Sequence, residues 1–246
     1  MAQRLVDAYP SSIEHRLDTQ LSLAARIRSH EAQSVPKTAP FITLSRQYGC
    51  EAIALAEALM PRLAEAEGLS GERWQMYSRQ ILETMASQEH LSSRLIEALD
   101  VHTRSNIEEF FDTLLGKSPP DIRVLKHLVR TERALASIGH CIIIGRGGVL
   151  LTAGLPGGMH VRLIAPEAWR LSHLVKQFGW DERKAQDYLH EEESGRHSFF
   201  HKYLGQDEND PLHYDLILNV AHLGREEQVA AILGLFNERL PKKPKL

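Results

Sequence analysis

The sequence is poor in cysteine and has no excess of one charge. Cys50 and Cys141 are its two cysteines, each in or beside an apolar segment, so they do not make a disulfide framework. The 29 basic and 32 acidic residues give a formal net charge of −3, whereas proteins that bind nucleic-acid polymers usually carry a basic surface. We therefore expect buried free thiols, a reducing cytoplasmic location and no nucleic-acid polymer as a partner.

Long apolar runs and metal-binding patterns are also missing. No run approaches the ~20 apolar residues that cross a bilayer, and residues 1–20 contain no apolar core of the signal-peptide kind. The 13 histidines are scattered. His197 and His201 are one helical turn apart, but no third ligand is near them in the sequence. The residues thus identify no metal site, and we expect no membrane partner.

Short apolar segments alternate with helical periodicities along the chain. Strands are predicted at residues 41–45, 74–77, 141–144, 159–165 and 214–220. Helices are predicted at residues 11–32, 51–67, 121–137, 166–178, 181–203 and 224–240, with two or three further pieces within 78–115. This alternation indicates an α/β fold, with a parallel sheet and right-handed crossovers.

The first predicted helix precedes the first strand, and a proline-containing linker separates the two. We therefore predict an N-terminal helical extension and linker at 1–39, a main domain at 40–240 and a basic tail at 241–246. The helix is expected to pack against the main domain or against a second copy of the chain. A homodimer through this helix is thus one hypothesis for the protein's partners.

Two junctions between strand and turn have the features of a phosphate site. The turn Ser45–Gly49 leads directly from the first strand into a helix, whose first turn offers unpaired N–H groups and the positive end of the helix dipole. A second turn, Gly145–Gly148, follows the apolar strand at 141–144. Because the carboxyl ends of parallel strands lie at one edge of a sheet, we expect Arg46 and Arg146 at the same edge.

Four motifs follow one another along the chain: SRQYG at Ser45–Gly49, IIIGRGG at Ile142–Gly148, VRLIAPEAWR at Val161–Arg170 and YDLILN at Tyr214–Asn219. Together they resemble the cytidylate kinase-like family, a bacterial branch of the P-loop nucleoside monophosphate kinases. The resemblance implies a three-layer α/β/α core, with a helical substrate-binding insertion at about 70–137 and a lid region at about 179–212. It also implies transfer of the γ-phosphoryl group of ATP, with Mg²⁺, to a nucleoside monophosphate, nominally CMP.

The resemblance also assigns residues that bind phosphate or nucleotide. Gly145 and Arg146 match a pair that contacts the monophosphate substrate, and Arg133 falls where cytidylate kinases have a substrate-binding arginine. The first phosphate-binding loop is matched by Ser45, Arg46, Gln47, Tyr48 and Gly49, and Cys50, the next residue, is a further candidate for phosphate binding.

Three arginines are the catalytic candidates that the resemblance implies. Arg46, Arg170 and Arg196 are expected to neutralise charge in the transition state, because a guanidinium group meets phosphate oxygens with a forked and always-charged head. Asp215, in the last-strand motif, is a further candidate.

The chain departs from the family pattern in and around the first loop. Cys50-Glu51-Ala52 stands where the family usually has Ser/Ala-Gly-Gly, so Cβ atoms and a negative charge enter the loop. The lysine and the Ser/Thr that end a G-x-x-x-x-G-K-[ST] loop are also missing, and Ser194 replaces a lysine of the lid motif. Three hypotheses remain open: an ATP-dependent kinase, a kinase-like nucleotide-binding or regulatory protein that has lost turnover, and a scaffold that dimerises through its first helix.

Overall fold

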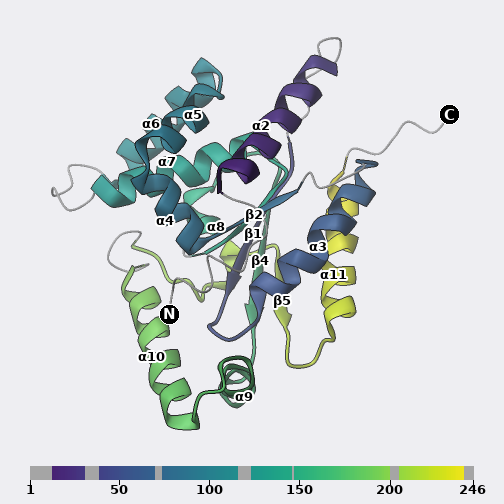
Figure 1. The fold of residues 1–246 in the computed structure, drawn as a ribbon, viewed down its shortest axis with the longest axis vertical. Helices are drawn as coiled ribbons and strands as arrows, with labels where there is room; N and C mark the ends of the chain where they lie inside the picture. Colours follow the sequence, from purple (N-terminus) through teal and green to yellow (C-terminus); the bar gives the residue numbers. More distant parts are fainter. Residues whose placement is uncertain are drawn as a thin grey trace. The chain divides into compact units, whose positions relative to one another are not determined.

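The structure is a computed structural model that describes residues 13–30, 39–69, 74–115, 123–145, 147–199 and 205–240. Its strands are β1 (Phe41–Arg46), β2 (Gln75–Ser78), β3 (Cys141–Ile144), β4 (Gly158–Ile164) and β5 (Leu216–Asn219). They form a five-stranded parallel sheet in the order β2-β3-β1-β4-β5. The predicted α/β fold is confirmed (Figure 1).

One or more of the described helices follow each strand along the chain (Figure 1). They are α2 (Ile13–His30), α3 (Ala52–Ala66), α4 (Arg79–Ser87), α5 (Glu89–Glu97), α6 (Val101–Leu115), α7 (Arg123–Ile138), α8 (Gly148–Leu151), α9 (Glu167–Phe178), α10 (Glu182–Phe199) and α11 (Arg225–Arg239), with a 3-10 turn, η3, at Pro211–His213. Neither α8 nor η3 was predicted, because so short an element shows no periodicity in the sequence.

The middle of the sheet is apolar and its edge is short. Every residue of β3 is buried, as its uniformly apolar sequence predicts. At the edge, β4 and β5 pair in parallel, with Val161 opposite Leu216 and Ile164 opposite Asn219. β5 is shorter than the predicted strand at 214–220. Since β1 and β4 are neighbours in a parallel sheet, the segments that follow them emerge at the same edge.

The chain folds as two compact units, each built from separate segments. Unit 1 comprises Met1–Ile42, Arg73–Ile143 and Leu150–Gly158, and unit 2 comprises Thr43–Glu72, Ile144–Val149 and Met159–Leu246. The N-terminal helix, α2, thus groups with the helical segment α4–α7 in unit 1. The β1–α3 junction, the α9–α10 pair and α11 belong to unit 2.

In unit 1, α2 forms part of the core. Leu17 is fully buried in the same apolar cluster as Tyr77. Gln20 is also buried, and its amide nitrogen donates to the carbonyl oxygens of Leu135 at 3.2 Å and Gly139 at 2.7 Å. Its side-chain oxygen accepts a hydrogen bond from the Tyr77 hydroxyl at 2.6 Å. Polar and apolar contacts together join α2 to β2 and α7 within unit 1.

In unit 2 the helices pack in two pairs, α3 with α11 and α9 with α10. α3 and α11 lie side by side (Figure 1). α9 ends at Gly179, which has the left-handed backbone conformation (φ 65°) that glycine adopts without strain. The Asp181 carboxylate then accepts the Lys184 N–H at 2.9 Å and caps α10, which confirms the predicted helix start at this residue.

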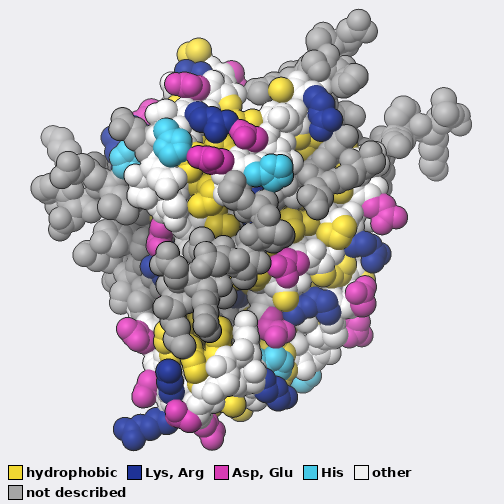
Figure 2. Space-filling model, in the orientation of Figure 1, with side chains coloured by type: hydrophobic (Ala, Val, Ile, Leu, Met, Phe, Trp, Pro, Cys, Tyr) yellow, Lys and Arg dark blue, Asp and Glu magenta, His cyan; other side chains and the backbone are white. Residues whose placement is uncertain are grey.

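Other predictions concern the cysteines, the surface and the ends of segments. Cys50 and Cys141 are buried and lie outside any disulfide. Acidic and basic side chains are mixed over the described part of the face in Figure 2, in keeping with the small net charge. Among the described helices, none is long and apolar enough to span a membrane. The predicted tail at 241–246, most of the linker before β1 and the predicted end of α10 at 200–203 lie outside the described residues.

Candidate functional site

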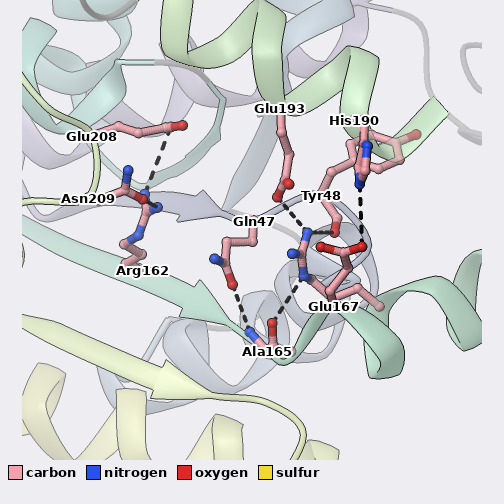
Figure 3. A network of polar contacts seen from close by, with 10 residues as sticks. Gln47, Tyr48, Arg162, Ala165, Glu167, His190, Glu193, Glu208 and Asn209 are labelled. Atoms are coloured by element: carbon pink, nitrogen blue, oxygen red, sulfur yellow. Dashed lines mark hydrogen bonds and ion pairs between the residues drawn. The ribbon is translucent and has the colours of Figure 1, made fainter. Parts of the chain in front are cut away.

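The loop between β1 and α3 (residues 47–51, the β1–α3 loop) begins with a residue that extends the sheet. The Gln47 N–H donates to the carbonyl oxygen of Leu163 at 3.0 Å. The Gln47 side-chain oxygen accepts the Ala165 N–H at 3.0 Å (Figure 3). Gln47 therefore continues the pairing of β1 with β4 beyond the ends of both strands. This fixes the direction in which the loop leaves the sheet.

Gly49 brings the loop against α9. Its φ is +90°, and a Cβ atom placed on it would lie 3.0 Å from the Arg170 Cβ and 3.1 Å from the Arg170 carbonyl oxygen. The carbonyl oxygen of the preceding residue, Tyr48, accepts a hydrogen bond from Arg170 Nη1 at 3.1 Å. Both the backbone conformation and the close approach therefore require glycine at this position.

The Tyr48 side chain anchors the loop in the α9–α10 pair. Its ring meets the Tyr188 ring edge-on, with 5.5 Å between centroids, and packs against the apolar cluster of Leu174, Ala185 and Leu189. Burial, and then the neighbouring Tyr188, raise the pKa of Tyr48 well above its usual value. The hydroxyl therefore stays neutral at physiological pH, and Tyr48 acts as a packing residue in this structure.

Arg170, on α9, is buried, and its guanidinium group has three hydrogen-bond partners. Its Nε donates to the Ala165 carbonyl oxygen at 3.0 Å, and its Nη1 donates to Tyr48 O at 3.1 Å and to the Glu193 carboxylate at 2.5 Å. Figure 3 shows Tyr48, Ala165 and Glu193 converging on this guanidinium group. Arg170 thereby joins the β1–α3 loop, the segment after β4 and α10.

The end of the loop carries an ion pair and an unusual backbone conformation. Glu51, the N-cap of α3, has φ 48° and ψ 37°, in the left-handed region, and its side chain does not cap the helix. Its carboxylate instead lies 2.9 Å from Nη2 of Arg225, the first residue of α11. The sequence did not single out Arg225, because it is far from the loop along the chain and belongs to no motif.

Residues 41–222 match the cytidylate kinase-like family. The chain belongs to this family. It is therefore a nucleotide kinase-like protein, as the four motifs predicted. The match covers β1, the β1–α3 loop, the α9–α10 pair and β5, whereas α2 and α11 lie outside the matched residues.

Structural similarity agrees with the fold of this cytidylate kinase-like chain. An uncharacterized protein from Eubacterium ventriosum superposes with a TM-score of 0.61 and 16% identity, over 82% of this chain and 100% of that one. A shikimate kinase from Bacteroides thetaiotaomicron gives a TM-score of 0.43 at 12% identity, over 80% of this chain and 97% of that one, which is too low to show a shared fold.

One curated relative matches over a short segment. A stretch of 106 residues is 27% identical to the uronate isomerase of Corynebacterium glutamicum and covers 41% of this chain. The match covers 19% of the length of that isomerase. So partial a match does not show membership of its family, and it carries no argument about activity.

Other candidate residues of the cytidylate kinase-like site occupy the strand ends of unit 2. Ser45 is buried within β1, Arg46 is half-buried at its end, and Gly145 is buried directly after β3. Arg146 lies outside the described residues. The backbone of Arg196 belongs to α10, but its side chain is not among those described. In unit 2, the structure therefore brings together residues of the β1–α3 loop with Arg170.

Arg133 lies on α7 in unit 1. Its Nη1 donates to the carbonyl oxygens of Leu151 at 2.8 Å and Ala153 at 3.2 Å, and its guanidinium carbon lies 3.6 Å from the centre of the Phe110 ring. Burial lowers the pKa of Arg133 to about 10, so it stays charged near neutral pH. The adjacent Glu132 is also buried, and burial raises its pKa to about 8.

Asp215 lies just before β5, at the edge of the sheet where the strands begin. It accepts the His160 N–H at 2.7 Å and two hydrogen bonds from Arg239, at 3.0 Å and 2.7 Å. Burial opposes its ionisation, but these hydrogen bonds outweigh burial, so the pKa of Asp215 lies below its usual value. In this position it joins the start of β4 to the end of α11, at the edge opposite the β1–α3 loop.

A second polar network was missed by the sequence analysis. Arg162, buried on β4, donates to the Asn209 side chain at 2.6 Å (Figure 3). It also donates to the Tyr214 hydroxyl at 3.1 Å. The Tyr214 hydroxyl in turn donates to the Glu208 carbonyl oxygen at 2.8 Å. This network fixes the segment that leads into β5. A charged residue inside an otherwise apolar strand was the signal that the sequence offered.

The loop fits a phosphate group through its backbone. The Glu51 side chain does not cap α3, and the first N–H groups of a helix, together with the positive end of its dipole, attract anions. The carboxylate of Glu51 is offset by Arg225. Within the described ranges, no three His, Cys, Asp or Glu side chains are grouped as a metal site. Mg²⁺ that accompanies a nucleotide is usually held by one or two carboxylates and by the phosphates themselves.

Proposed function

We propose that the protein is a nucleotide phosphotransferase that transfers a phosphoryl group from ATP to a nucleoside monophosphate, nominally CMP. The observation that carries this proposal is the β1–α3 loop. It is held by Gln47, Tyr48 and Gly49 against β4 and α9, and it leads into a helix whose N-terminus has no side-chain cap. A rigid loop before a helix N-terminus suits phosphate binding, because its N–H groups are already in place.

Each part of the proposed site has a distinct role. The first turn of α3 would hold the donor phosphates, and bound Mg²⁺ would neutralise charge on the transferring group. We assign Arg46 and Arg196 to the charge that develops in the transition state. We assign Arg170 a positioning role, because Glu193 and two carbonyl oxygens engage its guanidinium group. The turn at 145–148 is the proposed acceptor site.

The test is a transfer assay with ATP, Mg²⁺ and a panel of nucleoside monophosphates, with products separated by ion-exchange chromatography. We expect phosphorylation of at least one pyrimidine monophosphate. R46Q should lower kcat by about 100-fold or more, because one arginine on a transferring phosphoryl group contributes at least that much. E226Q, which changes an exposed carboxylate on α11, is the control. Folded protein that forms no product with any acceptor would contradict the proposal.

The second candidate function is nucleotide binding without transfer. It is favoured by the engagement of Arg170 with Glu193, which removes a cation from the proposed reaction, and by the carboxylate that Glu51 brings to the loop. Titration calorimetry with ATP separates the two candidates. Heat of binding together with no detectable product over hours would favour the binding protein.

The proposed partners are small nucleotides in the cytoplasm, rather than a nucleic-acid polymer or a membrane. These remain proposals that rest on the small net charge and on the family. A homodimer through α2 is also a proposal, and the burial of Leu17 and Gln20 within unit 1 weighs against it.

A further inference from the structure

Glu51 occupies a backbone conformation that suits glycine. Its φ of 48° and ψ of 37° lie in the left-handed region, and it is one of two non-glycine residues with positive φ in the described ranges. A side chain with a Cβ is strained there. Strain of this kind persists where the surroundings impose it and is frequent at functional sites. The Glu51 side chain therefore calls for a reason beyond the shape of the turn.

The contact that Glu51 makes supplies that reason. Its carboxylate pairs with Arg225 at 2.9 Å, and Arg225 is placed by a second hydrogen bond, from its Nη1 to the Gln228 side chain at 3.2 Å. The pair joins the segment after β1 to the segment after β5, at the edge where nucleotide would bind. The acidic neighbours of Arg225 have other contacts: Glu227 accepts the Gly224 N–H at 2.7 Å, and Glu226 lies 3.8 Å from Arg62.

We propose that Arg225 is a ligand of the donor phosphates and that Glu51 pairs with it while no phosphate is bound. This inference rests on the proposed function. In the free protein the Glu51 carboxylate pairs with Arg225 and does not cap α3. When a polyphosphate binds at the N-terminus of α3, it replaces this carboxylate as the partner of Arg225, and the Glu51 side chain turns away. Arg225 thus supplies a cation that the loop lacks, since Ala52 and Ile53 follow Glu51 and no lysine does.

The exposure of the ion pair makes such an exchange feasible. The side chain of Arg225 is 28% exposed and that of Glu51 is 35% exposed. Ion pairs in contact with water contribute little net stability, because solvent screens both charges. A polyphosphate carries several charges and more acceptor oxygens than one carboxylate, and it therefore competes well for a guanidinium group. The exchange leaves Arg225 paired in both states.

The test measures binding of inorganic tripolyphosphate, and of ATP, by titration calorimetry, so it does not depend on turnover. E51Q should tighten binding of tripolyphosphate by about tenfold, because it removes the carboxylate that competes with the phosphates for Arg225. R225Q should weaken binding by a similar factor. The double variant E51Q/R225Q decides which residue matters: if Arg225 is a ligand, the gain from E51Q is lost in the double variant.

The control variant is E226Q. It removes one carboxylate from the residue next to Arg225 and breaks the Arg62–Glu226 contact between the same two helices. It should leave the affinity for tripolyphosphate within about twofold of the original, because exposed and distant charges are screened. Thermal melting of each variant checks that it is folded. E51Q and R225Q are expected to shift the affinity for tripolyphosphate in opposite directions, whereas a general loss of structure would lower it in both variants.

Three results would overturn the inference. If the unchanged protein binds ATP and E51Q binds it no better, Glu51 does not compete with the phosphates for Arg225, and the proposed function stands. If the double variant keeps the gain of E51Q, Arg225 is not a phosphate ligand, and the proposed function again stands. If all variants are folded and none binds ATP or tripolyphosphate at millimolar concentration, both the inference and the proposed function fail.

Discussion

At the scale of single residues, the β1–α3 loop limits what can replace Gly49. Alanine at this position meets both an unfavourable φ of +90° and the Arg170 backbone, whose carbonyl oxygen would lie 3.1 Å from the new Cβ. We expect G49A to lower the free energy of unfolding by about 2–4 kcal/mol, from backbone strain and overpacking together. Urea unfolding followed by circular dichroism measures this change.

Gly68 provides the matched control for Gly49. Its φ is +69°, but apart from its two chain neighbours no atom of the described residues lies within 4 Å of the Cβ that alanine would add. G68A should therefore cost about 1 kcal/mol, from backbone strain alone. Equal costs for the two variants would show that the contact of Gly49 with α9 does not constrain the loop.

Glu132 makes the stability of the protein depend on pH. Burial raises its pKa from an ordinary 4.5 to about 8, so the folded protein binds this proton more tightly than the unfolded chain does. Its favourable contribution is complete below the unfolded pKa and is lost as pH rises towards the folded one. The glutamine in E132Q has nearly the same shape as the glutamic acid side chain but cannot ionise. At about pH 8 it should be more stable than the unchanged protein by a few kcal/mol, at about 1.4 kcal/mol per pH unit.

Near about pH 4.5 the two proteins should be close in stability, because Glu132 is then largely protonated in the folded state and its ionisation gives the unfolded chain little advantage. Urea unfolding at the two pH values gives the comparison. A difference in stability that is the same at both would mean that ionisation of Glu132 is not the cause.

At the scale of elements, Arg170 joins α9 and α10 to the β1–α3 loop. Lysine keeps the charge at this position but loses the fork that serves two carbonyl oxygens and Glu193. We expect R170K to cost about 2–3 kcal/mol, because buried carbonyl groups are left without donors. Amide hydrogen exchange in α10 should become faster, and mass spectrometry of peptides from α10 measures it.

The control for Arg170 is a second contact between the same helices. Glu167 on α9 lies 3.3 Å from His190 on α10, with both side chains at least half exposed. E167Q should change stability by less than about 0.5 kcal/mol and leave exchange in α10 unaltered. If E167Q and R170K have equal effects, burial of Arg170 is not what holds the helices together.

The sequence predicted elements where a single local pattern was decisive. The uniformly apolar run at Cys141–Ile144 fixed β3, and the helical pattern of α3 was strong enough to continue through Pro61. In the site, the loop residues are consecutive in the chain, so a motif was sufficient to find them. The contacts of Arg170 with Glu193 and of Glu51 with Arg225 could not be predicted, because tertiary folding alone brings these residues together.

At the scale of the whole molecule, contacts between distant segments define compact units that no local pattern in the sequence marks. Linker composition predicts an extension at 1–39 that is followed by one main domain, and this division stays a prediction. By its contacts, α2 groups with Arg73–Ile143 in unit 1. Compact units made of separate segments depend on which surfaces pack together, and periodicity along one segment does not contain that information.

The grouping of α2 with unit 1 leads to a prediction about truncation. Without α2, the Tyr77 hydroxyl and the carbonyl oxygens of Leu135 and Gly139 lose the Gln20 side chain, and the apolar cluster loses Leu17. In a truncated chain that begins at Ala39, unit 1 should therefore be unfolded. The milder variant Q20A should cost about 3 kcal/mol, because it leaves several buried groups unsatisfied.

D18N is the control for Q20A. Asp18 lies on the exposed side of the same helix, α2, and forms an ion pair with Arg94 of α5. D18N should change stability by less than about 0.5 kcal/mol.

Light scattering after size exclusion separates a structural role of α2 from a dimerising one. If the truncated chain melts like the full chain but has half its mass in solution, then α2 serves a dimer, and its burial within unit 1 is not needed for folding.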